Sequence, residues 1–274
     1  MAEPRAVADH YRRANLSAII LAALDAAGKD IDHLSPDDLA PIDELHSRGR
    51  EATVDLARLL ALTGDESLLD LGCGIGGPSR YLAKTYGCRV TGLDLTPEFC
   101  EAAAMLAQRT GLADKVEYRQ GDALAAPFAD GSFDIVWSQN VAMNIDDRDR
   151  LYGEIRRVLK AGGRYGFSDI VDAGRGPLHF PVPWARDSSI SFLLSAPATR
   201  AKLEAAGFRI IVFEDLTQRA FVRARERMKS AGAPLALGLH TVLGQDAPTM
   251  LKNMLSNYEE GRIGLFQGVA VRAD

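Results

Sequence analysis

Two patterns of apolar and polar residues divide the chain. Residues 1–65 have the spacing of amphipathic helices, interrupted by the proline-containing connector HLSPDDLAPIDELH. From Ser67 onward, short apolar runs alternate with amphipathic segments, which is typical of βαβ units and a parallel sheet. The strands that this second pattern predicts are SLLDLG, RVTGLDL, KVEYRQ, FDIVWSQ, RYGFSDI, FRIIVFEDL and LFQGVAVRA.

Cap residues mark the helices between these strands. Thr96 is an N-cap, Pro97 occupies the first turn, and Gly111 ends that helix. Further helices are expected over 146–160 and 198–206, each ending just before glycine. Because parallel strands are buried on both sides, the pattern predicts an α/β fold with helices on both faces of the sheet.

Two long segments, 171–197 and 217–264, interrupt the α/β pattern. The first is rich in proline and aromatic residues, and the second is helical by its apolar spacing. Insertions of this length are more often lids or pocket walls than idle loops, so both are expected to cap the sheet. Within the second, the basic helix RAFVRARERMK is interpreted as a solvent-exposed face, with contact to an anionic substrate as the alternative.

Composition narrows the class of protein. A net charge of −5 over 274 residues lacks the basic excess of a nucleic-acid surface. The apolar segment AIILAALDAAG is too short to span a bilayer and has acidic residues around it, unlike a signal peptide, so we expect no membrane span. Cys73, Cys88 and Cys100 lack metal-binding spacing, which favours reduced thiols in a cytoplasmic protein without a metal.

The stretch LLDLGCGIGGPSRYLA joins the first predicted strand to a helix through four glycines. Glycine lets the backbone approach a ligand closely, and the helix N-terminus offers free N–H groups and a positive dipole end. An ordinary turn requires only one residue of this kind, so the loop predicts a nucleotide-like ligand. The spacing Gly72-x-Gly74-x-x-Gly77 fits either NAD or S-adenosylmethionine.

Acidic residues near the ends of the first three strands separate these two ligands. Asp94 ends the second strand, where a carboxylate can bind the ribose hydroxyls of either one. Asp70 precedes the glycine loop and can face a cationic amino group, whereas a pyrophosphate there would meet a negative charge. Asp122 follows Gly121 and can accept a hydrogen bond from an adenine amine. The carboxyl ends of parallel strands share one ligand-binding edge, so the three acids together favour S-adenosylmethionine.

These motifs resemble the class I S-adenosylmethionine-dependent methyltransferases. LLDLGCGIGG, VTGLDL, GDA and FDIVWSQ follow the family's order, within 67–169. The stretch WSQNVAMNIDDRDRLYGEIRRVLKAGGRYGFSDI is most similar to small-molecule enzymes of the tocopherol, ubiquinone/menaquinone and sarcosine–dimethylglycine methyltransferase group. The resemblance implies a Rossmann-like sheet of seven mostly parallel strands with an antiparallel last strand and helical lid insertions. We expect residues 1–65 to form an N-terminal helical lid and 66–274 the cofactor-binding methyltransferase domain with its two cap insertions.

The resemblance also implies residue roles. Asp70 and the glycine loop would hold the methionine end of the cofactor, Asp94 the ribose and Asp122 the adenine amine. Leu95 and Ala123 would flank the adenine ring, and Gln139 and Asn140 would lie beside the sulfonium. The complete expected cofactor site is Asp70, Gly72, Cys73, Gly74, Gly76, Asp94, Leu95, Gly121, Asp122, Ala123, Gln139 and Asn140, with Tyr11 as a side chain that could close over the cofactor.

The acceptor side is less specified. Methyl transfer requires alignment and exclusion of water, and it needs a base only where the acceptor carries a proton. His179 and His240 are the candidate bases, although a lone histidine is more often a packed or surface residue. Trp184 and Tyr258 are candidate substrate-binding pocket walls, with core packing as the alternative.

The predicted function is S-adenosylmethionine-dependent methyl transfer to an N, O or C atom of a small metabolite, releasing S-adenosylhomocysteine. A non-catalytic cofactor-binding protein is the alternative, because fold does not fix function. An NAD-dependent oxidoreductase is the weaker alternative, since the sequence has no Tyr-x-x-x-Lys pair. Ser138-Gln139-Asn140-Val141 stands where DNA methyltransferases carry an Asn/Asp-Pro-Pro-aromatic stretch, so nucleic acid is not expected as a partner. The sequence leaves the acceptor and a possible homodimer open.

Overall fold

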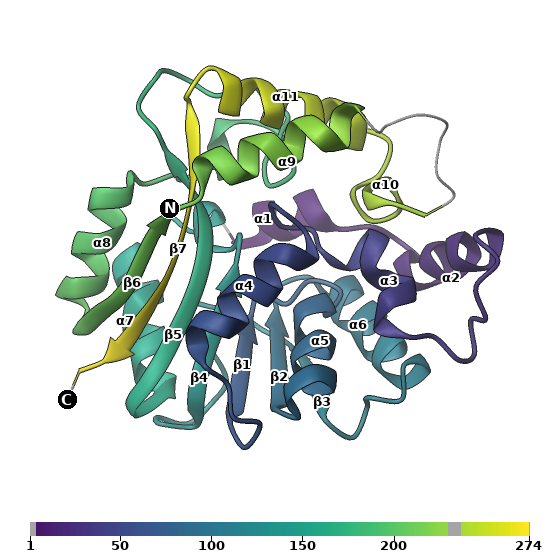
Figure 1. The fold of residues 1–274 in the computed structure, drawn as a ribbon, viewed down its shortest axis with the longest axis horizontal. Coiled ribbons are helices and arrows are strands. Elements are labelled where there is room, and N and C mark those ends of the chain that lie inside the picture. Colours follow the sequence, from purple (N-terminus) through teal and green to yellow (C-terminus); the bar gives the residue numbers. More distant parts are fainter. Residues whose placement is uncertain (1–3, 230–236, 274) are drawn as a thin grey trace.

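Seven strands of the computed structural model, which describes residues 4–229 and 237–273, form a sheet of order β3-β2-β1-β4-β5-β7-β6 (Figure 1). The strands are β1 (Ser67–Leu71), β2 (Arg89–Asp94), β3 (Val116–Gln120), β4 (Phe133–Gln139), β5 (Leu159–Asp172), β6 (Phe208–Asp215) and β7 (Ile263–Arg272). Strands β1 to β5 pair in parallel, and β7 runs antiparallel between β5 and β6. The predicted seven-stranded, mostly parallel sheet with an antiparallel last strand is therefore confirmed.

Helices cover both faces of this sheet and its carboxyl edge (Figure 1). They are α1 (Pro4–Tyr11), α2 (Leu16–Ala26), α3 (Pro36–Asp43), α4 (Arg50–Leu60), α5 (Gly77–Tyr86), α6 (Pro97–Arg109), α7 (Arg148–Val158), α8 (Ala196–Ala205), α9 (Thr217–Lys229), α10 (Leu239–Leu243) and α11 (Ala247–Glu259), with short 3-10 helices η1 (Ala142–Asn144) and η2 (Ser188–Ile190). One apolar cluster contains Leu56 of α4, Leu82 of α5 and Ala107 of α6, and another contains Leu151 of α7 and Leu203 of α8. Burying these faces stabilises the sheet by roughly 1.5–3 kcal/mol for each large apolar side chain.

The boundary between α7 and β5 differs from the sequence prediction. The apolar spacing predicts a helix as far as Lys160, but α7 ends at Val158. Leu159 is instead paired with Phe133 across the sheet, and a register shift follows before Ile135. Sheet pairing thus outweighs local helical spacing at this point, and β5 begins earlier than the predicted RYGFSDI.

Helix α4 lies within the predicted N-terminal lid segment, yet it packs directly on the sheet. Its Leu60 side chain is fully buried against β5, and a Cβ atom on Gly166 would lie 2.6 Å from the Leu60 Cδ1 atom. Only glycine at position 166 lets the helix come this close to the strand. The remaining N-terminal helices, α1 to α3, gather with α9 to α11 at the carboxyl edge of the parallel strands, above the sheet in Figure 1.

This cap is itself a packed structure. Helix α2 lies on α6 through a cluster that joins Leu16, Ile20 and Leu24 to Phe99 and Leu106. A search of the described helices for one long and apolar enough to cross a lipid bilayer finds none.

Candidate active site

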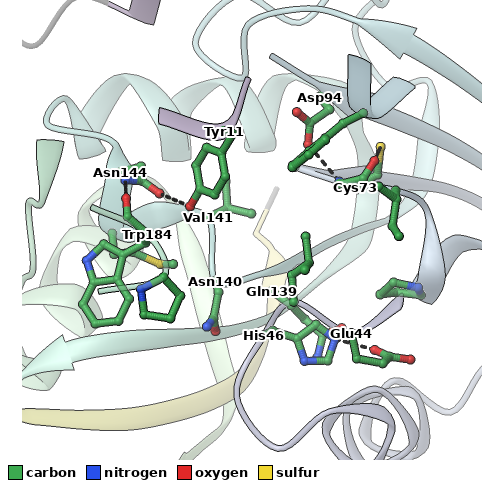
Figure 2. A pocket seen from close by; sticks show the side chains of 18 of the residues that line it. Tyr11, Glu44, His46, Cys73, Asp94, Gln139, Asn140, Val141, Asn144 and Trp184 are labelled. Atoms are coloured by element: carbon green, nitrogen blue, oxygen red, sulfur yellow. Dashed lines mark hydrogen bonds and ion pairs between the residues drawn. The ribbon is translucent and has the colours of Figure 1, made fainter. Parts of the chain in front are cut away.

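A cavity of about 880 Å³ opens between the carboxyl ends of the parallel strands and the helical cap. Its floor comes from the ends of β1, β2 and β4 and from the loop after β3, and its walls come from α1, the 43–50 loop and the caps (Figure 2). This volume is at the upper end of the range for small-molecule sites in proteins. The sheet edge predicted to bind the ligand is therefore the edge that carries the cavity.

Most of the predicted cofactor residues line this cavity. They are Asp70, Gly72, Cys73, Gly74, Asp94, Leu95, Gly121, Asp122, Ala123, Gln139, Asn140 and Tyr11. Gly76 does not line it, because the ring of Tyr118 fills the space that a side chain at this position would enter. Gly76 lets the ring of Tyr118 pack against the loop, and its contact with the cofactor stays a prediction.

The glycine loop and Asp94 hold each other in place. Gly74 has a φ of 54°, and the nearest atom to a Cβ built there is Leu45 Cδ1 at 3.6 Å. The backbone of the loop is therefore accessible from the cavity. The Gly74 N–H donates to Asp94 Oδ2 at 2.8 Å, and the Thr96 N–H donates to Asp94 Oδ1 at 2.9 Å. Burial raises the pKa of Asp94, while these N–H donors lower it. The remaining carboxylate lone pairs are available to a ligand.

Asp70 is a buried acid that lacks a cationic partner in the described chain. Its side chain is nearly inaccessible, and Ser79 Oγ donates to Asp70 Oδ2 at 2.5 Å. Burial raises the pKa of Asp70 to about 7, against the opposing effects of Ser79 and His46. A cationic ligand group beside this carboxyl would favour its ionised form.

Two neighbouring residues at the end of β4, Gln139 and Asn140, line the cavity and carry buried amide atoms without partners among the described residues. Gln139 Oε1 accepts from Trp137 Nε1 at 3.1 Å, and an indole N–H can only donate, so the orientation of the Gln139 amide is fixed. Within the described chain, its Nε2 atom is buried without a hydrogen-bond partner, and so is Oδ1 of Asn140. Asn140 also has a φ of 54°, a strained backbone for a residue with a side chain. A buried donor beside a buried acceptor indicates a polar ligand at this position.

Asn144 ties three segments together at the roof of the cavity. Its Oδ1 accepts from Tyr11 Oη of α1 at 3.0 Å, and its Nδ2 donates to the carbonyl oxygens of Trp184 and Ile190 at 2.7 and 2.8 Å. Trp184 is 1% exposed and lines the cavity, so it is both a core residue and a wall (Figure 2).

The connector before α4 supplies a polar cluster that the sequence analysis missed. Glu44 and His46 are buried and line the cavity, and His46 Nε2 lies 2.6 Å from Glu44 Oε2 (Figure 2). Thr53 Oγ1 lies 3.0 Å from Glu44 Oε2 and 3.2 Å from both His46 Nε2 and Gln139 Oε1. Burial raises the pKa of Glu44, but His46 and Arg50 outweigh it and bring that pKa to about 2. The available signal was the run Glu-Leu-His-Ser-Arg that follows Pro36 and Pro41, and locally this run predicts a loop.

Three predicted acceptor-side residues lie away from the cavity. His179 is 42% exposed and pairs with Glu260 at 2.9 Å, and His240 is exposed on α10. Tyr258 is buried in an apolar cluster, and its Oη lies 3.3 Å from Ser47 Oγ. None of the three lines the cavity, so their predicted catalytic and wall roles are corrected. Conversely, Arg223 and Arg227 of the basic helix do line it, which the interpretation as a solvent-exposed face missed.

Among residues 4–229 and 237–273, no group of three or more His, Cys, Asp or Glu side chains is arranged to hold a metal ion. Cys73, Cys88 and Cys100 are all buried free thiols.

Comparison with known sequences places these features in a family. Residues 69–167 match the family described as "Methyltransferase domain". The sarcosine/dimethylglycine N-methyltransferase of Halorhodospira halochloris is 34% identical over 193 residues, which cover 70% of this chain and 68% of the relative. A protein of Oryza sativa subsp. japonica, named "Probable tocopherol O-methyltransferase, chloroplastic", is 46% identical over 99 residues, which cover 36% of this chain and 27% of that protein.

Comparison with solved structures concerns the fold alone. Geranyl diphosphate C-methyltransferase from Streptomyces coelicolor A3(2), solved with Mg²⁺, geranyl-S-thiolodiphosphate and S-adenosyl-L-homocysteine, matches with a TM-score of 0.72 at 21% identity. The match covers 98% of each chain, so the cap helices as well as the sheet have counterparts in that structure.

Proposed function

Because the chain belongs to the class I S-adenosylmethionine-dependent methyltransferases, we propose that it transfers a methyl group from S-adenosylmethionine to an N, O or C atom of a small metabolite. The observation that carries the proposal is the set of acids Asp70, Asp94 and Asp122 around a glycine loop in one cavity. The buried, unpartnered amide atoms of Gln139 and Asn140 support it, because buried polar groups normally have a partner and a polar ligand in the cavity would supply one.

These residues fit S-adenosylmethionine by charge and position. We propose that Asp70 faces its ammonium group, that Asp94 accepts from the ribose hydroxyls, and that Asp122 accepts from the adenine amine. Leu95 and Ala123 would lie against the adenine ring. When bound, the cofactor supplies an electrophilic methyl group, so the chain has mainly to orient the acceptor and exclude water.

The acceptor chamber would be closed by the N-terminal helices and the two cap insertions. Support comes from Tyr11, which lies over the cavity through its bond to Asn144, and from Trp184 in its wall. Gln139 and Asn140 would face the sulfonium from the floor, and Tyr11 would cover the cofactor. A covered chamber suits a small acceptor better than a polymer.

The direct test uses S-adenosylmethionine with a deuterated methyl group and a metabolite extract. We expect a product heavier than its precursor by one labelled methyl group, found by mass spectrometry only when the protein is present. A non-catalytic cofactor-binding protein would bind the cofactor and yield no such product, and an NAD-dependent oxidoreductase would bind NAD instead. Light scattering distinguishes a monomer from the homodimer that the sequence left open. We propose a cytoplasmic location because the three thiols are unpaired.

Asp94→Ala is expected to weaken S-adenosylmethionine binding by about 1.5–3 kcal/mol, the value of hydrogen bonds to a charged acceptor. Isothermal titration calorimetry measures this change. Glu117→Ala is the matched control, since this acid is 57% exposed on β3 and does not line the cavity. Normal binding by the Asp94 variant would show that this carboxylate does not bind the cofactor. A binding signal from NAD, with none from S-adenosylmethionine, would contradict the assignment as well.

The affinity for S-adenosylmethionine should rise with pH up to about neutrality. Asp70 has a pKa of about 7 in the free protein, so below pH 7 its proton must leave before it can face an ammonium group. Linkage then predicts that the binding constant for S-adenosylmethionine increases by up to about tenfold per pH unit below pH 7 and is constant above it. Calorimetry in buffers of different ionisation enthalpy should detect proton release. Asp70→Asn should bind more weakly and without this slope, and a wild-type affinity independent of pH would contradict the assignment.

A further inference from the structure

We propose that His46, oriented by Glu44, is the general base that removes a proton from the acceptor. The inference rests on the proposed methyl transfer and adds to it the class of acceptor, namely a hydroxyl, phenol or amine whose O–H or N–H must lose its proton. An acceptor that already presents a free lone pair would have no need of this pair of residues.

The position of His46 places it at the reacting end of the cavity. A single hydroxyl, Thr53 Oγ1, lies 3.2 Å from His46 Nε2 and 3.2 Å from Gln139 Oε1. Gln139 in turn ends β4, where the proposed sulfonium position lies. Figure 2 shows His46 and Gln139 beside each other on the same side of the pocket. The Nε2 edge of the imidazole thus lies on the side of Gln139. The Nδ1 edge lies beside Ser47, which also lines the cavity.

Glu44 fixes which imidazole nitrogen can accept a proton. The Glu44 carboxylate has a pKa of about 2 and is therefore ionised at neutral pH. Its Oε2 lies 2.6 Å from His46 Nε2, so Nε2 carries the hydrogen and donates it. Nδ1 has only the Ser47 carbonyl oxygen at 3.4 Å, beyond the usual hydrogen-bond range, so Nδ1 is the nitrogen left to act as a base.

Glu44 is itself held in one orientation. Arg50 Nε donates to its Oε1 at 2.6 Å, and the histidine takes the other oxygen. A carboxylate that orients a histidine and stabilises its protonated form is the arrangement used to activate nucleophiles in other enzymes. The charged groups that act on this pair are Arg50 of α4, Asp43 at the end of α3 and Asp70 of β1.

The proposed step conserves atoms and electrons. A proton leaves the O–H or N–H of the acceptor and forms a bond to His46 Nδ1. The electron pair that remains on the acceptor atom forms the new bond to the methyl carbon, and the pair of the broken carbon–sulfur bond stays on sulfur. The imidazolium beside ionised Glu44 then loses its proton to water.

The test compares His46→Ala with His179→Ala, a histidine that lies outside the cavity. Each variant receives labelled S-adenosylmethionine and the same metabolite extract, so the product can be followed by mass before the acceptor is identified. We expect His46→Ala to form product at least about 100-fold more slowly, the usual contribution of a general base. Millimolar imidazole should restore much of this rate, while His179→Ala should behave as wild type.

A second readout separates a base from a structural residue. S-adenosylhomocysteine should bind His46→Ala within a few-fold of wild type, which shows that the cavity is intact. Glu44→Gln should slow product formation, yet add nothing in the His46→Ala background, because it acts through the histidine. Two results would overturn the inference: a wild-type rate in His46→Ala, or a loss that imidazole does not restore while S-adenosylhomocysteine still binds. Absence of any product from the wild-type protein would instead count against the proposed function itself.

Discussion

Replacing Arg80 by methionine is expected to lower the free energy of unfolding by about 3–5 kcal/mol, because it leaves a buried carboxylate without its hydrogen-bonded partner. Arg80 of α5 and Asp43 at the end of α3 are both fully buried, and their Nη2 and Oδ1 atoms lie 2.5 Å apart. Arg80 Nη1 also donates to the carbonyl oxygen of Ile75 in the glycine loop at 2.7 Å. The methionine would lose both interactions while filling most of the same space.

Chemical denaturation measures this change, with Arg200→Met as the control. Arg200 pairs with Glu204 on the surface of α8, with side chains 48% and 53% exposed, so its loss should cost less than about 1 kcal/mol. The double variant Asp43→Leu with Arg80→Met should recover part of the lost stability, because no isolated charge remains. An Arg80 variant as stable as the Arg200 variant would show that the pair contributes nothing to the fold.

The same ion pair links stability to the site. Asp43 immediately precedes Glu44, and its carbonyl oxygen lies so close to Gly77 that a Cβ there would approach it to 2.5 Å. Arg80 therefore fastens the connector that carries Glu44 and His46 onto the glycine loop. Loosening this contact should reduce cofactor binding as well as stability.

Removing residues 1–14 is expected to lower methyl transfer on the order of 100-fold, the effect of a misplaced or wetted reacting centre. The cut deletes α1, whose Tyr11 lines the cavity and donates to Asn144, and whose His10 Nε2 lies 3.1 Å from the carbonyl oxygen of Pro183. It retains α2, so Leu16 and Ile20 still cover α6 and the sheet keeps its packing.

The measurement is paired. Labelled-product formation from the metabolite extract reports turnover, and calorimetry with S-adenosylhomocysteine reports the cofactor site, for which we expect a loss of no more than about tenfold. Tyr11→Phe is the control, since it keeps the ring and removes only the bond to Asn144. Full turnover after the deletion would place α1 outside the chamber and would reopen the question of a macromolecular acceptor.

The sequence by itself determined the sheet and the cofactor edge. The apolar runs of the strands, the four glycines and the cap residues act locally, so their meaning survives without knowledge of the rest of the chain. Asp70, Asp94 and Asp122 could be grouped in advance because the carboxyl ends of parallel strands always meet at one edge. The rule predicts that the three acids share one site, and in the structure all three line the same cavity.

Only the tertiary structure decided which residues face the acceptor. His46 and Gln139 both contact Thr53, which precedes Gln139 by 86 residues. No periodic pattern in the sequence predicts that the connector before α4 lies beside the end of β4. His179 and His240 looked equally suitable in the sequence, but the packing of the caps turns both away from the cavity. The physical reason is that strand and helix signals depend on neighbouring residues, whereas the walls of a chamber depend on how separate segments pack against one another.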